Sequence, residues 1–361
     1  MTISLCMIVK NEEAVLERCL NSVQGVVDEI IIVDTGSTDA TKEIAHRYTD
    51  QVYSFAWCDD FSAARNFAFS KATREYCMWM DGDDVLEQED RQALLRLKTL
   101  LPREVDVVMM RYHVAFDEQG SPTFSYYRER IVRNTKAYRF KGRVHEAISP
   151  EGNVVYSEIA ISHRKLGESD PERNLRIYEA QKAAGEPFTP RDQFYYGREL
   201  YYHENFSQAI QVLRQFLEEG EGWIENNIEA CRTLSLCHAR LGQNRKAKMA
   251  LLRSLEYDIP RAEVCCDLGA LFLGEERYDQ AIFWYEQALS RKREDTSGAF
   301  ILPDCYGFLP CIQLCVCYDR LGQKEKARQY NERAGQYKPD SAVYQFNRAY
   351  YEKFFSEQMA K

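Results

Sequence analysis

The segment Tyr76-Cys77-Met78-Trp79-Met80-Asp81-Gly82-Asp83-Asp84 decides the fold, because an apolar run passes directly into three carboxylates. The apolar half predicts a buried strand, and the acidic half predicts a turn at its end. Negative charge packed this closely is costly without a cation, and oxygen ligands of this kind suit Mg²⁺ or Mn²⁺. We therefore expect Asp81 and Asp83 to hold a divalent cation. The alternative is an acidic turn in which Asp84 only caps the next helix.

Apolar, β-branched runs alternate with stretches of helical spacing around this segment. Alternation of this kind predicts an α/β domain with a parallel sheet covered by helices. Ligands of such sheets bind beyond the carboxyl ends of the strands, where the acidic turn is expected. Strands are expected at residues 3–9, 29–34, 51–55, 76–80, 105–116 and 126–133, further strands or strand–loop segments at 139–149 and 153–163, and helices at 12–23, 39–48, 60–72 and 87–101.

Small residues recur in a helical pattern beyond residue 190. Ala209, Ala247, Ala281 and Ala327 are separated by 38, 34 and 46 residues, and each follows a turn-like Gly or Asn. This pattern is similar to that of tetratricopeptide repeats, whose period is about 34 residues. Paired helices of this kind must stack to bury their apolar faces, so four units predict a short solenoid. The longest interval carries an insertion around residues 303–310.

The bulk composition excludes several classes of protein. A net charge of −9 argues against a general nucleic-acid binder, which needs a basic surface. No run of 18 apolar residues predicts a transmembrane helix. No signal peptide is expected, because residues 3–9 already form a strand. The 12 cysteines are therefore expected to be reduced thiols in a bacterial cytoplasm, with Cys311, Cys315 and Cys317 in the helical core rather than on zinc.

Two further strand ends carry polar candidates. Asp34, in Val33-Asp34-Thr35-Gly36-Ser37-Thr38-Asp39, ends one strand, where it could hold a nucleotide base or ribose; the alternative is a plain strand–turn–helix connection. His163 ends another strand and precedes Arg164 and Lys165, which could offset the charge of a diphosphate. The alternatives there are a structural histidine and solvated cations.

The order of these motifs resembles family 2 glycosyltransferases of the GT-A fold, a Rossmann-like α/β fold for nucleotide-diphospho-sugar transfer. The resemblance rests on a Lys-Asn-Glu-Glu helix start at residues 10–13, the Asp34 segment, Ala-Arg-Asn at 64–66 and the acidic turn at 81–84. It implies that Asn11, Glu12 and Asp34 hold the nucleotide.

The same resemblance implies roles for the remaining site residues. Asp81 and Asp83 bind the ribose and the metal, and Arg65 lines the donor pocket within reach of the diphosphate. His163 is implied as an additional metal ligand, and Arg164 as a diphosphate contact.

The resemblance also places a catalytic base in Phe140-Lys141-Gly142-Arg143-Val144-His145-Glu146. An inverting transfer needs a base to take the proton of the acceptor. Glu146 is the first choice and His145 the second. The alternative is an ordinary ion pair of these residues with Lys141 or Arg143.

A GT-A domain followed by tetratricopeptide repeats resembles SunS-type peptide S-glycosyltransferases, which attach a hexose to a cysteine of a bacteriocin precursor. The resemblance implies metal-dependent, inverting transfer of a hexose or N-acetylhexosamine from UDP-glucose or UDP-N-acetylglucosamine. The repeats would hold a peptide or protein acceptor, or a second subunit in a homodimer. The expected domains are a GT-A catalytic domain at residues 1–168, a linker helix at 169–190 and a repeat domain at 191–361.

Two other functions stay open at this point. One is glycosyl transfer in surface polysaccharide or glycolipid synthesis. The other is a non-catalytic scaffold, in which the repeats bind partner proteins and the GT-A half is a relic.

Overall fold

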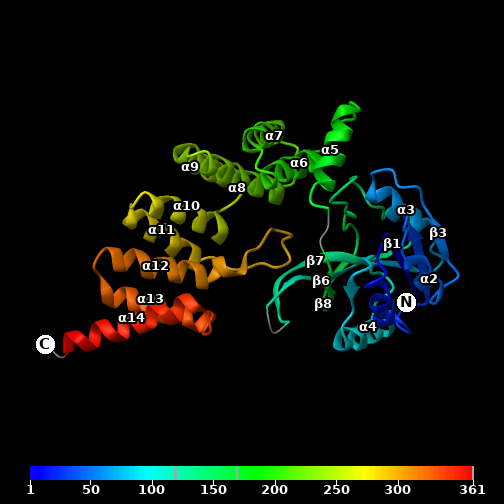
Figure 1. Cartoon of the computed structure of the whole chain (residues 1–361), viewed down its shortest axis with the longest axis horizontal. Helices are drawn as coiled ribbons and strands as arrows, with labels where there is room; N and C mark the ends of the chain where they lie inside the picture. The colour runs from blue at the N-terminus through cyan, green and yellow to red at the C-terminus, as the bar shows by residue number, and fades with distance from the viewer. Residues whose placement is uncertain (118–119, 168–169, 360–361) are drawn as a thin grey trace. The chain divides into compact units, whose positions relative to one another are not determined.

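The computed structural model describes residues 1–117, 120–167 and 170–359, and the chain divides into two compact units, Met1–Asp192 and Gln193–Lys361 (Figure 1). The boundary expected between residues 168 and 169 lies outside the described residues. Helix α5 (Arg173–Ala183) lies in the stretch expected as a linker. The three-part division of the chain stays a prediction.

The first unit is built on an eight-stranded mixed sheet with the order β3-β2-β1-β4-β7-β6-β8-β5. Strands β3, β2, β1 and β4 are mutually parallel, as the sequence predicts. Strands β7 and β5 pair antiparallel to their neighbours. The strands are β1 (Ile3–Val9), β2 (Glu29–Asp34), β3 (Val52–Ser54), β4 (Tyr76–Trp79), β5 (Asp84–Val85), β6 (Val107–Phe116), β7 (Pro122–Arg133) and β8 (Val154–His163).

The register of these strands brings the polar strand ends together. Val9 of β1 pairs with Asp34 of β2, so Asp34 lies at the carboxyl edge of the parallel part. Strand β4 ends at the same edge, just before the acidic turn. The short strand β5 pairs with β8 so that Asp84 lies opposite His163. Asp34, the acidic turn and His163 therefore all lie at the carboxyl ends of the parallel strands.

Helices cover both faces of this sheet. Buried residues of α1 (Leu16–Val23), α2 (Thr41–His46) and α4 (Gln88–Leu100) pack with one face. Buried residues of α3 (Phe61–Lys71) pack with the other. Helix α1 forms here because its apolar residues recur at helical spacing; they are Leu16, Cys19, Leu20 and Val23, and all four are buried.

Residues 139–149, expected as a strand or a strand–loop segment, do not form a regular strand. This stretch is a loop that folds back on itself through one bridge between Lys141 and Ala147. Gly142 and His145 have φ angles of 96° and 51°, which an extended strand does not allow. Its apolar residues are nevertheless buried, which explains the strand-like pattern.

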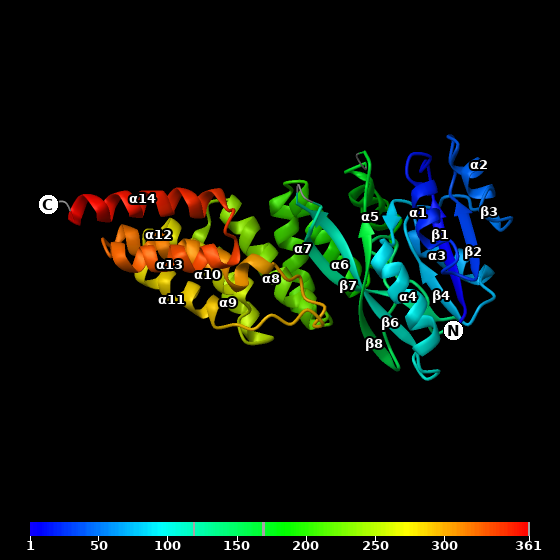
Figure 2. The ribbon, with the colours of Figure 1, turned by 90° about the horizontal axis from the view of Figure 1, so that it is seen from below.

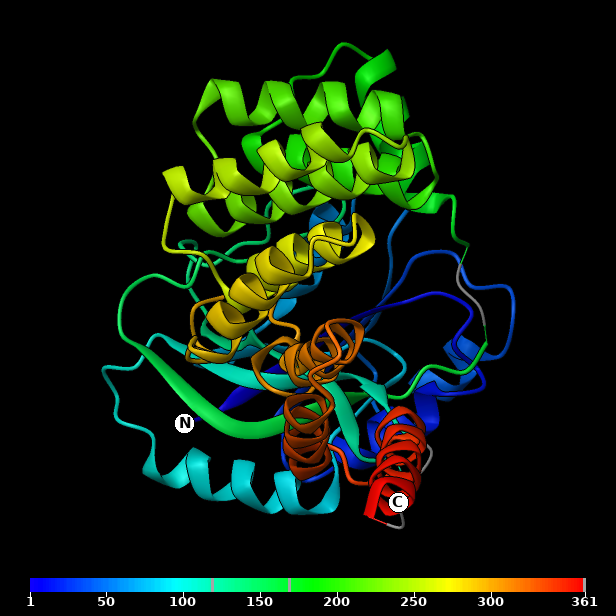
Figure 3. The same cartoon turned by 90° about the vertical axis from the view of Figure 1, so that its left-hand side faces the viewer.

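The second unit is a series of helix pairs, as the repeat pattern predicts, which Figures 2 and 3 show following one another from green to red. Ala209, Ala247, Ala281 and Ala327 are all fully buried, and each is the fourth residue of the second helix of its pair. The pairs are α6 (Pro190–Tyr202) with α7 (Phe206–Glu219), α8 (Ile224–Arg240) with α9 (Asn244–Arg253), α10 (Ala262–Gly274) with α11 (Tyr278–Leu289), and α12 (Phe308–Arg320) with α13 (Lys324–Tyr337); α14 (Ala342–Met359) follows.

Glycines explain how closely the paired helices approach. A Cβ at Gly197 would lie 2.5 Å from Leu213 of the second helix, and one at Gly269 would lie 2.8 Å from Tyr285. A side chain larger than hydrogen would force these helices apart.

All twelve cysteines are free thiols, and eleven of them are buried. Cys311, Cys315 and Cys317 pack with apolar residues of the helical core, as expected. Cys58, in the loop before α3, is exposed. In the described ranges, no helix combines the length and the apolar character that crossing a membrane requires.

Candidate functional site

Asp84 is the buried centre of the acidic turn, not a helix cap. It is fully buried, and its carboxylate pairs with Arg130 at 3.0 Å and accepts a hydrogen bond from the Tyr112 hydroxyl at 3.1 Å. It also accepts the backbone N–H of Asp81 at 3.0 Å. Helix α4 begins after Glu87 instead. The cap interpretation is therefore wrong, and Asp84 holds the turn in place.

Arg130 is a site residue that the sequence analysis missed. Its guanidinium lies between two rings, 3.7 Å from the centroid of Trp79 and 4.1 Å from that of Tyr112. It also donates to the carbonyl of Trp79 at 3.1 Å. The local sequence offered no signal that singles it out, because Arg128, Glu129 and Arg133 lie in the same strand.

Asp83, Asp84 and His163 form the one group in the described part of the chain with ligand atoms close enough to hold a metal ion, all within 4.8 Å. His163 Nδ1 lies 3.2 Å from each carboxylate and 3.0 Å from the Tyr112 hydroxyl. Burial lowers the pKa of His163, but the two carboxylates outweigh it and raise the pKa to about 10. Asp81 is outside this group, and its role as a metal ligand stays a prediction.

Arg65 joins the acidic turn to the loop that carries the expected base. Its Nη2 lies 2.7 Å from Asp81 and its Nε 2.6 Å from Glu146. The guanidinium is nearly buried over Trp79, and its Nη1 has no hydrogen-bond partner. Burial raises the pKa of Asp81, but Arg65 outweighs it and lowers the pKa to about 2. Asp81, Arg65 and Glu146 therefore form a charged row.

The residues implied in nucleotide binding form a second cluster. Asp34 accepts the backbone N–H groups of Gly36 and Ser37 at 3.1 Å and pairs with Lys42. Burial raises the pKa of Asp34, but the bonds from Ser37 and Lys42 lower it overall. Asn11, with a φ of 55°, accepts the backbone N–H of Thr38 at 2.9 Å. Asn11 and Asp34 thus hold the same turn.

Glu12 connects the two clusters. A Cβ at Gly82 would lie 2.9 Å from Glu12 Cγ, so the glutamate packs directly on the acidic turn. Burial raises the pKa of Glu12 first, repulsion by Asp83 and Asp81 adds to it, and the result is about 7. A half-protonated carboxyl at neutral pH marks this pocket as excessively negative.

His145 and Arg164 are connected to these clusters mainly through their backbone groups. Arg191 donates to the backbone carbonyl of His145 at 2.9 and 3.0 Å, which fixes the loop around the expected base. Arg164 donates its backbone N–H to the carbonyl of Asp83 at 3.0 Å. Its guanidinium lies over the ring of Phe116 and 3.4 Å from Glu87.

Replacing Glu12 by glutamine is expected to stabilise the metal-free protein above neutral pH. The unfolded carboxyl titrates near 4.5 and the folded one near 7, so the wild type loses stability as pH rises between them. The variant lacks this loss. Because Glu12 is only half-buried and solvent screens its charge, the gain is expected to be about 1 kcal/mol above pH 7 and to vanish below pH 4. Urea denaturation with a chelator at several pH values measures it. A pH-independent difference would contradict the argument.

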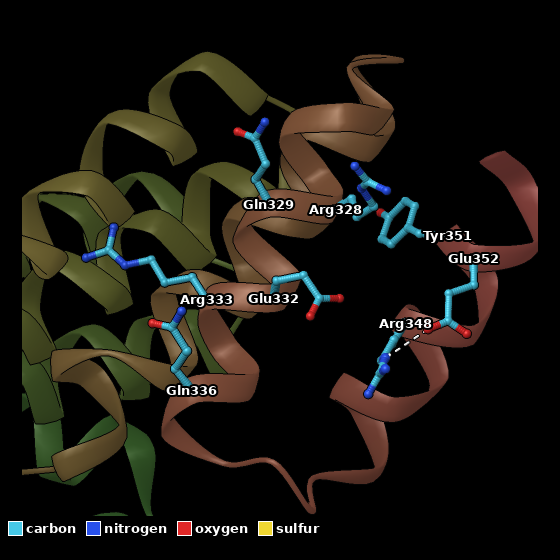
Figure 4. A pocket seen from close by; sticks show the side chains of 8 residues that line it. All are labelled: Arg328, Gln329, Glu332, Arg333, Gln336, Arg348, Tyr351 and Glu352. Atoms are coloured by element: carbon cyan, nitrogen blue, oxygen red, sulfur yellow. Dashed lines mark hydrogen bonds and ion pairs between the residues drawn. The ribbon is translucent and has the colours of Figure 1, made fainter.

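The second unit has an opening of its own between α13 and α14, of about 550 Å³. Figure 4 shows Arg328, Arg333 and Arg348 with Glu332 and Glu352 around it. None of the residues expected at the catalytic site lines this opening.

Comparisons with known proteins agree with both units. Residues 4–161 match the family model described as Glycosyl transferase family 2, and residues 262–295 match a tetratricopeptide repeat. A TPR repeat-containing protein of Synechococcus elongatus is 37% identical over 147 residues, which cover 40% of this chain and 35% of that protein. The prophage-derived glycosyltransferase SunS of Bacillus subtilis is 27% identical over 281 residues, 74% of this chain and 65% of SunS.

A third relative has a different described role. The lipopolysaccharide core biosynthesis glycosyltransferase LpsC of Rhizobium meliloti is 29% identical over 159 residues, 42% of this chain and 58% of LpsC. The chain thus spans less than two thirds of the length of each of these relatives.

Proposed function

We propose that the protein transfers a sugar from a nucleotide-diphosphate donor to a peptide or protein, because residues 4–161 match the glycosyl transferase family 2 model and residues 262–295 match a tetratricopeptide repeat. The observation that carries this proposal is the charged row Asp81–Arg65–Glu146 beside the acidic group of Asp83, Asp84 and His163. In this proposal these residues supply a cation site, a diphosphate-binding cation and a carboxylate base close to one another.

The donor is a UDP-hexose or UDP-N-acetylhexosamine in this proposal. The turn held by Asn11 and Asp34 receives the nucleotide, with Glu12 beside it. Arg65 contacts the diphosphate through Nη1, which has no partner in the described protein and costs free energy while it stays buried and unpaired. Arg164 offsets the remaining phosphate charge.

The acidic group fits a divalent cation such as Mn²⁺ or Mg²⁺. Two carboxylates and one imidazole within 4.8 Å are an acceptable donor set, and oxygen ligands favour these ions. Asp83 and His163 would hold the ion, with Asp81 or Asp84 as the third protein ligand. The bound ion would neutralise the diphosphate as it leaves.

Glu146 is the proposed base, with His145 as the second choice. Its carboxylate accepts a hydrogen bond from Arg65, so it is oriented toward the same pocket as the acidic turn. It would take the proton of the acceptor as the acceptor attacks the sugar, and the configuration at the anomeric carbon would invert. A cysteine thiol is the preferred acceptor group, since it needs little help from a base.

Donor binding tests this proposal directly. We expect UDP-glucose or UDP-N-acetylglucosamine to raise the melting temperature by several degrees with MnCl₂, since a ligand at 100 times its Kd adds about 2.7 kcal/mol. The Asp81→Asn, Asp83→Asn double variant is expected to lose this shift. Glu89→Gln, which changes an exposed carboxylate in the first turn of α4, is the matched control and keeps it.

Two results would overturn the proposal. One is the absence of a shift with UDP-, GDP- and dTDP-sugars alike, and the other is an unchanged shift in the double variant. The similarity to LpsC supports a second candidate, transfer to a polysaccharide or glycolipid, but it covers only 42% of this chain. Mass spectrometry of cysteine-containing and serine-containing peptides after incubation with the donor separates the two candidates, because only the peptide activity adds sugar to them.

A further inference from the structure

The insertion between α11 and α12 lies along the first helices of the repeats. Helix α11 ends at Leu289 and α12 begins at Phe308. Figures 1 and 2 show this segment (orange) leaving the helix pair as a long loop. Its contacts include one set each with the first, second and third repeats.

The first contact is aromatic. The ring of Phe300 lies 6.0 Å from that of Phe194, and the guanidinium of Arg198 lies 4.4 Å from the centroid of Phe300. Phe194 and Arg198 are one helical turn apart on α6. The insertion thus places an aromatic side chain against an aromatic residue and a cation of the first repeat.

The second contact brings the backbone close to a ring. Gly298 has a φ of +77°, and a Cβ there would lie 2.6 Å from Cη2 of Trp223, which precedes α8. Only glycine fits this backbone conformation at this distance without a shift.

The third contact is a pair of hydrogen bonds to a buried carboxylate. Leu302 donates its backbone N–H to Glu263 at 2.8 Å, and the Tyr306 hydroxyl donates to the same carboxylate at 3.0 Å. Glu263, on α10, is only 2% exposed. Without the insertion this carboxylate would lose both bonds, which is costly for a buried charge.

The contacts in the first and third repeats lie on corresponding faces. Phe194 stands three residues before Gly197, and Cys266 stands three residues before Gly269. The two glycines face the second helices of their pairs. Cys266 lies 3.8 Å from the carbonyl of Cys305 in the insertion. The insertion therefore follows one continuous surface of the first helices.

We propose that this surface of α6, α8 and α10 binds an extended peptide that carries an aromatic side chain, and that residues 298–302 are its built-in occupant. A partner peptide binds by replacing this segment: its aromatic ring takes the place of Phe300 beside Arg198, and a backbone N–H takes the place of Leu302 at Glu263. Backbone bonds together with side-chain pockets are a recurring mode of peptide recognition. The assignment of this surface as the acceptor site rests on the proposed function. Peptide binding by the surface does not itself require sugar transfer.

Exchange concerns residues 298–302 and leaves residues 303–306 in place, because Cys305 is only 3% exposed and packs in the helical core. Leu302 is 43% exposed and Phe300 is half-buried, so the departure of residues 298–302 leaves that core intact. Tethering gives the built-in segment an effective concentration in the millimolar range. A free peptide of equal intrinsic affinity therefore binds the wild type weakly, and binds tightly only when the segment is loosened.

The probe is a fluorescent synthetic peptide with the sequence of residues 296–306, and its anisotropy is measured with the full chain. We expect Phe300→Ala to bind it at least ten times more tightly than the wild type. Adding Arg198→Ala to this variant, or replacing the phenylalanine of the peptide by alanine, is expected to abolish the gain. Phe283→Ala, which changes an exposed phenylalanine of α11, is the matched control and binds as the wild type does.

Equal binding by the wild type and Phe300→Ala would overturn the proposal, as would a gain that survives Arg198→Ala. If Phe300→Ala does not fold, a variant with residues 293–300 replaced by a Gly–Ser linker of the same length answers the same question. Loss of sugar transfer with peptide binding intact would count against the proposed function and leave this inference standing.

Discussion

Replacing Arg130 by methionine is expected to lower the free energy of unfolding of the first unit by about 3–5 kcal/mol, because it leaves a buried charge without its partner. Arg130 and Asp84 are both 0% exposed and lie 3.0 Å apart. Asp84 keeps the bonds from Tyr112 and from the backbone of Asp81, but its remaining charged partner, His163, is partly exposed and shared with Asp83. Hydrogen exchange of β4 and β7 in the full chain measures the change.

An exposed ion pair supplies the matched control for this prediction. Arg47→Met breaks a pair with Glu17 in which the side chains are 61% and 54% exposed, so it is expected to cost less than about 1 kcal/mol. Combining Arg130→Met with Asp84→Asn removes both buried charges, so the double variant is expected to lose less than the sum of the two single losses. Additive losses, or a loss at Arg130 as small as that at Arg47, would contradict the argument.

Replacing Glu146 by glutamine is expected to lower kcat of sugar transfer by a factor of about 10²–10⁴, the usual contribution of a positioned base. The KM for the nucleotide sugar is expected to change little, because the amide oxygen of glutamine can still accept the hydrogen bond from Arg65. Steady-state kinetics with a cysteine-containing peptide measures both constants. Glu151→Gln, an exposed carboxylate in the same loop, is the control and keeps the wild-type kcat.

The pH dependence of this defect distinguishes the acceptor atoms. A thiol ionises near pH 8.5, so raising the pH to 9 supplies thiolate without a base. The defect of Glu146→Gln is therefore expected to shrink at pH 9 for a thiol acceptor and to persist for a hydroxyl acceptor. If His145→Gln instead produces the loss of kcat, the second choice is the base and Glu146 only holds Arg65.

The sequence predicted the regular parts of the fold well, because the patterns there have one explanation. The strands at Ile3–Val9 and Glu29–Asp34 have the predicted bounds, since both are apolar runs ended by a polar residue. The ambiguity at residues 139–149 has the opposite cause. Buried residues of this loop mimic a strand, while the positive φ angles of Gly142 and His145 arise from contacts that the sequence does not display.

The site was predictable at strand ends and not beyond them. The acidic turn and Asp34 follow from position alone, because parallel strands end at one edge. Arg130 and Tyr112 meet Asp84 only because β7 and β6 join the sheet beside β4, and that order is a long-range property of the chain. The link from Arg65 to both Asp81 and Glu146 likewise depends on a loop fold that no local pattern encodes.

Because eleven cysteines are buried and Cys58 is exposed, a thiol reagent can label the native chain at one site. Burial shields the enclosed cysteines from maleimides, and it raises the pKa of Cys231 and Cys265 to about 12, so these two stay protonated at neutral pH. Cys58 is the exposed thiol, and it lies two residues before Asp60, the N-cap of the helix that carries Arg65. A fluorophore attached there reports from beside the proposed donor pocket, without a single cysteine having to be removed.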